Sequence, residues 1–159
     1  MTITLEKYKG TLEDWLNIKP PSKRAYVEEW HEEIKSQYEN NINGGGDLFA
    51  GILYGLFSDG ELVGRLRINN FHSCPQWVEV LNVTVKEELK GNGLGIEMMN
   101  LLFKEVKEVH KKEILVLTTS RAKGFYEKLG MTSLGEIQTT KENKLKDESF
   151  MYINLNKGK

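Results

Sequence analysis

Apolar and polar residues alternate in some stretches of the chain and recur at helical spacing in others, and this pattern predicts the first elements. Residues 2–8 alternate and predict a strand. Residues 11–18 predict a short helix, in which Thr11 is placed to cap the first turn. Residues 22–40 carry apolar side chains at the spacing of an amphipathic helix. The chain is therefore expected to begin with one strand and two helices.

Three strands are predicted to follow one another without a helix between them. Residues 49–57 and 61–71 are rich in apolar side chains, and the Asp59-Gly60 pair between them is typical of a two-residue hairpin turn. Residues 76–85 form the third strand by the same pattern. Strands that are joined by short turns pair antiparallel, so this part of the chain predicts an antiparallel sheet.

A long amphipathic helix is predicted over residues 93–111, and four shorter elements follow it. One apolar stripe runs along this helix and consists of Ile96, Met99, Leu102, Phe103, Val106 and Val109. The shorter elements are a strand over 113–119, a helix over 121–130 and strands over 131–137 and 149–155.

This order of elements predicts an α+β fold in a single domain over residues 1–159. We expect a central mixed, mostly antiparallel sheet of about seven strands, flanked by about four helices. One parallel crossover is expected at the glycine-rich loop. It runs from strand 76–85 through the long helix to strand 113–119.

The composition excludes several classes of protein. A net charge of -1 gives no reason to expect a nucleic-acid partner, and no apolar run is long enough to span a membrane. The first ten residues lack the apolar core of a signal peptide. Cys74 is the single cysteine, and the three histidines are scattered, so no disulfide and no metal site are expected. These features predict a cytoplasmic protein.

The most informative stretch is ELKGNGLGIEMMNLLF, residues 88–103, where Gly91, Gly93 and Gly95 stand directly before the long helix. The first turn of a helix has backbone N–H groups without partners, and glycine lets an anion come close to them. The stretch therefore predicts a phosphate-binding loop, although a plain turn would have the same glycines. A Walker loop is excluded, because Ile96-Glu97 stands where that loop needs Lys followed by Ser or Thr.

Two motifs resemble the GNAT N-acetyltransferase superfamily. The stretch from Lys90 to Gly95 is similar to its Arg/Gln-x-x-Gly-x-Gly/Ala signature, with Lys90 in place of the usual Arg or Gln. Residues 122–131, AKGFYEKLGM, are similar to its A-x-x-F-Y-E-K-L-G-F segment. The order of elements fits this superfamily over nearly the whole chain.

The resemblance implies acetyl-CoA, or another acyl-CoA, as a co-substrate, bound without a metal. In this superfamily the pyrophosphate rests on the amides of the glycine loop. The pantetheine arm pairs with the strand before the loop, and the following strand, 113–119, splays away. The residues implied to bind acetyl-CoA are Val83, Thr84, Val85, Lys90, Gly91, Asn92, Gly93, Leu94, Gly95, Ile96, Thr118 and Lys128.

Two residues are candidates for the chemistry. Glu79 shares a strand face with Val83 and Val85, and the resemblance implies a catalytic base there. A solvated carboxylate, with a water chain as the base, is the alternative. Tyr126 is the implied acid for the departing thiolate, and a role in core packing is its alternative.

The function that we expect is the transfer of an acetyl group from acetyl-CoA to a primary amine of a small molecule or peptide, by direct attack on the thioester. Two alternatives stay open. One is an acyl-CoA-binding regulatory module without turnover, and the other is acetylation of protein N-termini or lysines. The sequence identifies neither the amine acceptor nor the oligomeric state, and a homodimer is compatible with the resemblance.

Overall fold

The computed structural model describes six ranges of the chain: 2–18, 51–71, 74–89, 91–119, 122–137 and 148–156. The chain forms two compact units. The first comprises residues 1–70 and 80–102, and the second comprises residues 71–79 and 103–159. The helix predicted within 22–40 and the signature residue Lys90 lie outside the described residues.

Seven strands and four helical segments lie in the described ranges. The strands are β1 (Ile3–Lys7), β2 (Ile52–Ser58), β3 (Glu61–Asn70), β4 (Trp77–Val85), β5 (Ile114–Thr119), β6 (Thr132–Ile137) and β7 (Glu148–Asn154). The helical segments are α1 (Leu12–Leu16), the 3-10 helix η2 (Glu87–Leu89), α3 (Leu94–Glu108) and α4 (Lys123–Lys128).

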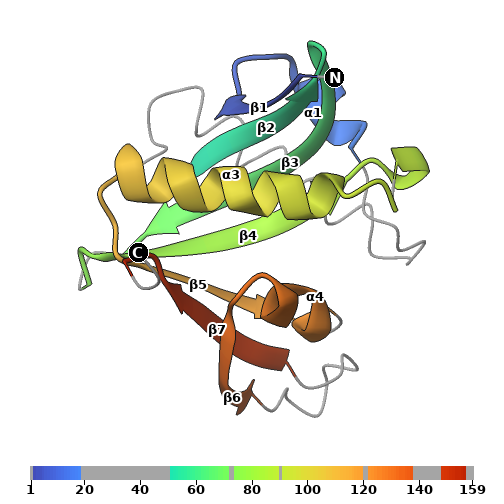
Figure 1. The fold of residues 1–159 in the computed structure, drawn as a ribbon. Coiled ribbons are helices and arrows are strands. Elements are labelled where there is room, and N and C mark those ends of the chain that lie inside the picture. The colour runs from blue at the N-terminus through green and yellow to red at the C-terminus, as the bar shows by residue number, and fades with distance from the viewer. Residues whose placement is uncertain are drawn as a thin grey trace, which may run out of the picture. The chain divides into compact units, whose positions relative to one another are not determined.

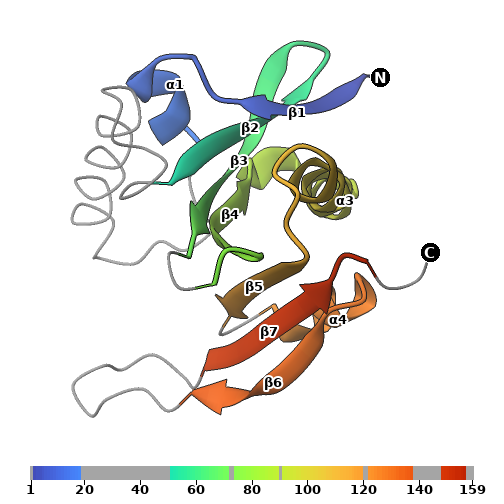
Figure 2. The same cartoon turned by 90° about the vertical axis from the view of Figure 1, so that its left-hand side faces the viewer.

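The strand order β1-β2-β3-β4-β5-β7-β6 confirms the predicted mixed sheet. The pairs β1–β2, β2–β3, β5–β7 and β6–β7 are antiparallel, whereas β4 and β5 run parallel. The parallel pair is the one that the crossover through α3 predicts. Asp59 and Gly60 both have positive φ, 49° and 87°, as a two-residue hairpin turn between β2 and β3 requires (Figure 2).

In the first unit, α3 lies tightly against one face of the sheet (Figure 1). A Cβ atom at Gly64 would lie 3.1 Å from the carbonyl oxygen of Thr84 and 3.3 Å from the sulfur of Met98. Gly64 is opposite Leu56 in the β2–β3 pair, so both residues face α3. The glycine therefore allows a helix side chain to approach the sheet more closely than any larger residue would permit.

The opposite face of the same strands is covered by α1. The rings of Tyr8 and Trp15 lie 4.7 Å apart and pack with Leu53. Arg65 is only 1% exposed on this face, and its Nε donates a hydrogen bond of 2.8 Å to the carbonyl oxygen of Ile18. Its guanidinium lies 5.5 Å from the Trp15 ring centre. Burial lowers the pKa of Arg65 to about 10.

The long helix α3 is shorter than predicted. It ends at Glu108, and Lys111 has a left-handed φ of 59°, which a continuing helix cannot have. Val109, expected in the apolar stripe, therefore lies outside the helix and is 57% exposed. Ile96 was also expected in the stripe but is 46% exposed. Leu102 lies at the centre of the buried side, and Ile96 lies about 120° away from it around the helix axis. The buried stripe consists of Leu94, Met98, Met99, Leu102 and Val106.

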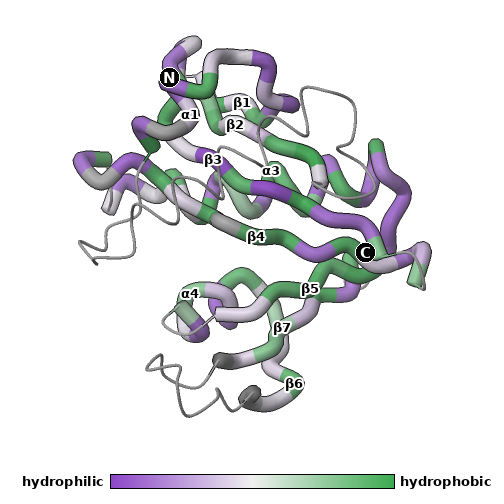
Figure 3. Tube along the Cα trace, turned by 180° about the vertical axis from the view of Figure 1, so that it is seen from behind, coloured by the Kyte–Doolittle hydropathy of each residue, from purple (hydrophilic) through white to green (hydrophobic). Residues whose placement is uncertain are grey.

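The second unit has one covered sheet face and one half-exposed face. Val78 and Leu115 are adjacent in register and lie on the covered face, where both side chains are fully buried. A Cβ atom at Gly130, just after α4, would lie 3.7 Å from Ile153 on that face, so α4 ends beside it. Figure 3 shows β5, at the centre of this unit, as an almost continuous hydrophobic stretch.

No helix within the six described ranges is both long enough and apolar enough to cross a membrane.

Candidate functional site

The glycine-rich loop connects η2 to α3 through two residues in left-handed conformation. Gly91 has φ 86° and Gly93 has φ 76°, values that residues with a Cβ atom rarely adopt. Between them, the side-chain amide of Asn92 donates a hydrogen bond of 3.1 Å to the carbonyl oxygen of Leu89. Asn92 was expected to contact acetyl-CoA. In the structure its hydrogen bond to Leu89 also ties the loop to the end of η2.

The backbone amides at the start of α3 are available to a ligand. The first helical hydrogen bond runs from the amide of Glu97 to the carbonyl oxygen of Gly93, at 3.0 Å. The amides of residues 94–96 have no hydrogen-bond acceptor within the described part of the chain. A Cβ atom at Gly91 or Gly93 would meet nothing within 4 Å, so the space beside the loop is open. Unpaired amides at the positive end of a 15-residue helix, next to open space, fit the oxygens of a pyrophosphate.

The predicted pantetheine strand is the end of β4. The side chains of Val83 and Val85 are half-buried, and Thr84 between them is buried. The parallel ladder from β4 to β5 has three register pairs and reaches Glu79 and Val116. From Val116, β5 stays paired with β7 as far as Thr119.

Tyr126 lies on α4, the six-residue helix that the second motif forms. Its ring is 7% exposed and meets the Phe125 ring edge-on, with centroids 5.1 Å apart. Its hydroxyl makes no hydrogen bond to any residue that the structure describes. Burial raises the pKa of Tyr126 to about 12. The phenol therefore keeps its proton well above neutral pH and can donate a hydrogen bond to a ligand.

The raised pKa of Tyr126 makes stability fall at alkaline pH. The folded pKa of about 12 exceeds the ordinary value of 10.0, so the stabilisation is complete below pH 10 and is lost as the pH rises toward 12. Between pH 8 and pH 11.5 the free energy of unfolding should fall by roughly 2 kcal/mol more in the wild type than in Tyr126→Phe. Urea denaturation at pH 8, 10 and 11.5 measures it. Equal losses in both proteins would show that the phenol ionises without cost.

Glu79 lies on one face of the second unit's sheet, and α4 ends beside the opposite face. Glu79 is half-buried and pairs in register with Val116, whereas α4 ends beside Ile153, on the other face. The two candidate catalytic residues are therefore not brought together on one face. Thr118 is exposed and lies on the face of Glu79, and Lys128 is exposed at the end of α4.

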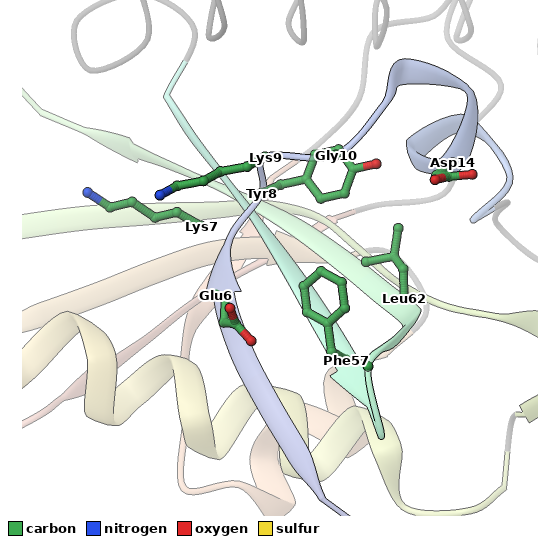
Figure 4. A pocket seen from close by; sticks show the side chains of 9 residues that line it. Glu6, Lys7, Tyr8, Lys9, Gly10, Asp14, Phe57 and Leu62 are labelled. Carbon is green, nitrogen blue, oxygen red and sulfur yellow. The ribbon is translucent and has the colours of Figure 1, made fainter.

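The sequence pattern missed two features of the first unit. The buried Arg65 is one, because strict alternation in β3 would assign an arginine to the solvent side. The other is an open cavity of about 480 Å³ beside β1 and α1 (Figure 4). Phe57 and Leu62 form part of its apolar wall, and the side chains of Lys7 and Lys9 extend away from it. None of the predicted site residues lines this cavity.

Comparison with protein families gives one match. The model of the acetyltransferase (GNAT) family matches residues 11–131, about three quarters of the chain, and this range includes both motifs. None of the curated proteins compared with the chain matches it in sequence.

Solved structures with the same fold have very different acceptors in their names. One is a chimera of spermidine N-acetyltransferase SpeG from Vibrio cholerae and hSSAT, with TM-score 0.77, 17% identity, and 98% of this chain and 96% of that chain covered. Another is the ribosomal-protein-S18-alanine N-acetyltransferase from Escherichia coli, with TM-score 0.70, 14% identity and coverage of 99% and 97%. A third is an aminoglycoside 6'-N-acetyltransferase complexed with coenzyme A, with TM-score 0.71, 16% identity and coverage of 98% and 98%. At these identities the likeness shows the fold alone.

Proposed function

We propose, since this chain belongs to the GNAT family of acetyltransferases, that it transfers an acetyl group from acetyl-CoA to a primary amine of a small molecule or peptide. The observation that carries the proposal is the glycine loop. The amides of residues 94–96, which have no acceptor among the described residues, and the open space beside Gly91 and Gly93 fit a pyrophosphate, and the family match includes this loop. The coenzyme A complex of the aminoglycoside enzyme, which has the same fold, agrees with such a ligand.

The donor would be held along the loop and the strand before it. The amides of residues 91–96 would bind the pyrophosphate, and the backbone of Val83–Val85 would pair with the pantetheine arm. Lys90 and Lys128 would add charge near the phosphates, and Thr118 would offer a hydroxyl to the pantetheine. Acetyl-CoA supplies an acetyl group on a thioester carbon, which an amine attacks to form an amide while the carbon–sulfur bond breaks.

Glu79 would act on the amine. A primary alkylammonium has a pKa of about 10.4, so at pH 7 it must lose a proton before it can attack. The Glu79 carboxylate is half-buried, where it can hold the ammonium and accept a proton from the nitrogen. The backbone amide near Val83 would stabilise the negative charge that develops on the thioester oxygen.

Tyr126 would act on the sulfur. Its phenol keeps its proton because burial raises the pKa to about 12, so it can donate a hydrogen bond to the departing thiolate and supply its proton. The overall change converts an ammonium and a thioester into an amide, a thiol and one released proton. Solvent then returns Glu79 and Tyr126 to their starting states. Because the two residues belong to opposite faces of the sheet, we infer that the amine and the thiol meet them from different sides.

Calorimetric titration with acetyl-CoA, followed by measurement of CoA release with a mixed panel of amines, tests this function. Binding followed by amine-dependent release is the expected result. Binding without release for any amine, peptide or protein would favour a regulatory module that keeps the loop without turnover. If acetyl-CoA does not bind, the glycines of residues 91–95 are only a turn and the proposal is wrong.

A further inference from the structure

The sheet of the first unit ends at β1, and the outer edge of this strand is a surface that the proposed function does not use. β1 is the end strand of the order β1-β2-β3-β4-β5-β7-β6 and pairs only with β2 among the described strands (Figure 2). An end strand presents a row of backbone amides and carbonyl groups that can pair with a strand of another chain. The edge of β1 is therefore a candidate interaction surface.

The hydrogen bonds between β1 and β2 identify the backbone groups on this edge. The amide of Tyr8 donates a hydrogen bond of 2.8 Å to the carbonyl oxygen of Leu53. Hydrogen-bonded pairs alternate along antiparallel strands, so every second residue before Tyr8 also bonds toward β2. The residues between them direct their amides and carbonyl groups away from β2, and these residues are Ile3, Leu5 and Lys7. Within the described ranges no hydrogen bond uses these outward groups.

The end strand of the second unit, β6, is protected in a way that β1 is not. β6 contains an extra residue, Leu134, where its register with β7 shifts between Ser133 and Gly135. Such a bulge twists an edge and interrupts its row of backbone groups, which hinders the addition of a strand. β1 keeps a single register with β2 over its whole length. Of these two end strands, β1 is therefore the one that can pair along its full length.

Apolar side chains along β1 are only partly covered. Leu5 is opposite Leu56, which faces α3, so Leu5 and Ile3 both project on the α3 side of the sheet. Both side chains are half-buried, and Lys7 at the end of the same row is exposed. A strand beside β1 would cover more of the two apolar side chains.

A second copy of β1 is complementary to this edge. When two copies pair antiparallel about a two-fold axis at Leu5, the two Leu5 residues are opposite each other. Ile3 of each copy is then opposite Lys7 of the other, and Thr4 is opposite Glu6. No two residues of like charge in β1 are directly opposite in this register. The two Glu6 residues are diagonal neighbours about 8 Å apart, a distance at which physiological salt weakens their repulsion.

We propose that this protein forms a two-fold symmetric dimer in which β1 of one copy pairs antiparallel with β1 of a second copy. About six backbone hydrogen bonds would join the two strands, through the outward groups of Ile3, Leu5 and Lys7. The first units of the two copies would then share one continuous sheet. A five-residue strand covers a small area, so the dimer should dissociate at roughly 10–100 μM protein.

Hydrogen exchange measured by NMR at about 10 μM and about 1 mM protein tests this pairing residue by residue. We expect the amides of Ile3, Leu5 and Lys7 to exchange at least about fivefold more slowly at the higher concentration. The amides of Thr4 and Glu6 bond toward β2 in both states, so their exchange should change much less. A dimer in which the three outward amides exchange as fast as in the monomer would overturn the inference.

Two variants of β1 test the dimer by sedimentation equilibrium. Leu5→Lys places two lysines opposite each other, and Lys7→Pro removes an outward amide without removing a hydrogen bond to β2. Each should raise the dissociation constant of the dimer at least about tenfold. Lys7→Pro keeps the test valid if Leu5→Lys fails to fold.

Leu134→Lys is the matched control, because it makes the same replacement at an exposed leucine on the bulged edge of β6. It should dimerise as the wild type does. A protein that stays monomeric up to about 1 mM overturns the inference, and so does a dimer that both β1 variants leave unchanged. A dimer that Leu134→Lys alone dissociates would place the interface at β6 and would also overturn it.

Discussion

The Gly93→Val variant is expected to bind acetyl-CoA about 30-fold more weakly than the wild type, the largest effect on donor affinity that we predict from a single substitution. Gly93 has φ 76°, where a β-branched residue costs about 1–2 kcal/mol. The new side chain would also fill the open space in front of the amides at residues 94–96. Both effects move the loop away from a geometry that accepts a pyrophosphate. Calorimetric titration with acetyl-CoA measures the change.

Gly60→Val separates the two effects. Gly60 has a similar positive φ of 87° and also has nothing within 4 Å of a Cβ position, but it lies in the β2–β3 hairpin. The two variants should lose similar stability in urea denaturation, and the hairpin variant should keep its affinity for acetyl-CoA. If both variants bind acetyl-CoA as the wild type does, the loop does not hold the phosphates.

The Glu79→Gln variant is expected to lower kcat/KM for the amine by about 100-fold or more, because general-base catalysis typically contributes 10²–10⁴-fold. Glutamine keeps the shape of the side chain but accepts no proton. The variant would depend on amine that solution has already deprotonated, so its kcat/KM should rise about tenfold per pH unit below the amine's pKa. Steady-state CoA release from pH 6.5 to 9.5 gives both profiles.

Glu113→Gln is a suitable control, since Glu113 is exposed just before β5 in the same unit. It should keep the wild-type profile, and both variants should keep the wild-type affinity for acetyl-CoA. A Glu79→Gln enzyme with unchanged kcat/KM and an unchanged pH profile would remove Glu79 from the mechanism. The water chain would then become the working hypothesis for the base.

Solved structures with this fold do not identify the acceptor of this chain. Enzymes named for spermidine, a ribosomal protein alanine and an aminoglycoside share this fold at 14–17% identity. Pyrophosphate recognition at a helix N-terminus uses backbone amides, which any sequence with the right glycines can present. Acceptor recognition uses side chains, and these differ at such identities. The acceptor of this chain therefore has to be inferred from its own side chains and not from the names of its neighbours.

Features that depend on neighbouring residues in the sequence were predictable. Local conformational preference accounts for the Asp59-Gly60 turn and for the left-handed Gly130 after α4. It also accounts for the helix cap at Thr11, whose hydroxyl oxygen accepts a hydrogen bond from the Asp14 amide at 3.1 Å. The order of strands and helices follows from hydrophobic periodicity. The predicted end of α3 was wrong by three residues. The apolar Val109 continues the hydrophobic pattern, but the backbone leaves the helix after Glu108.

The sequence by itself determined the element order, the family motifs and the glycine loop, because each is encoded within a few adjacent residues. Only the tertiary structure decided which faces the side chains share. Register between strands distant in sequence placed Glu79 with Tyr152, and α4 on the opposite face. Packing between α1 and β3 buried Arg65 at a position that alternation assigns to solvent. Such features depend on which distant segments pair and at what offset, and no local pattern in the chain encodes that offset.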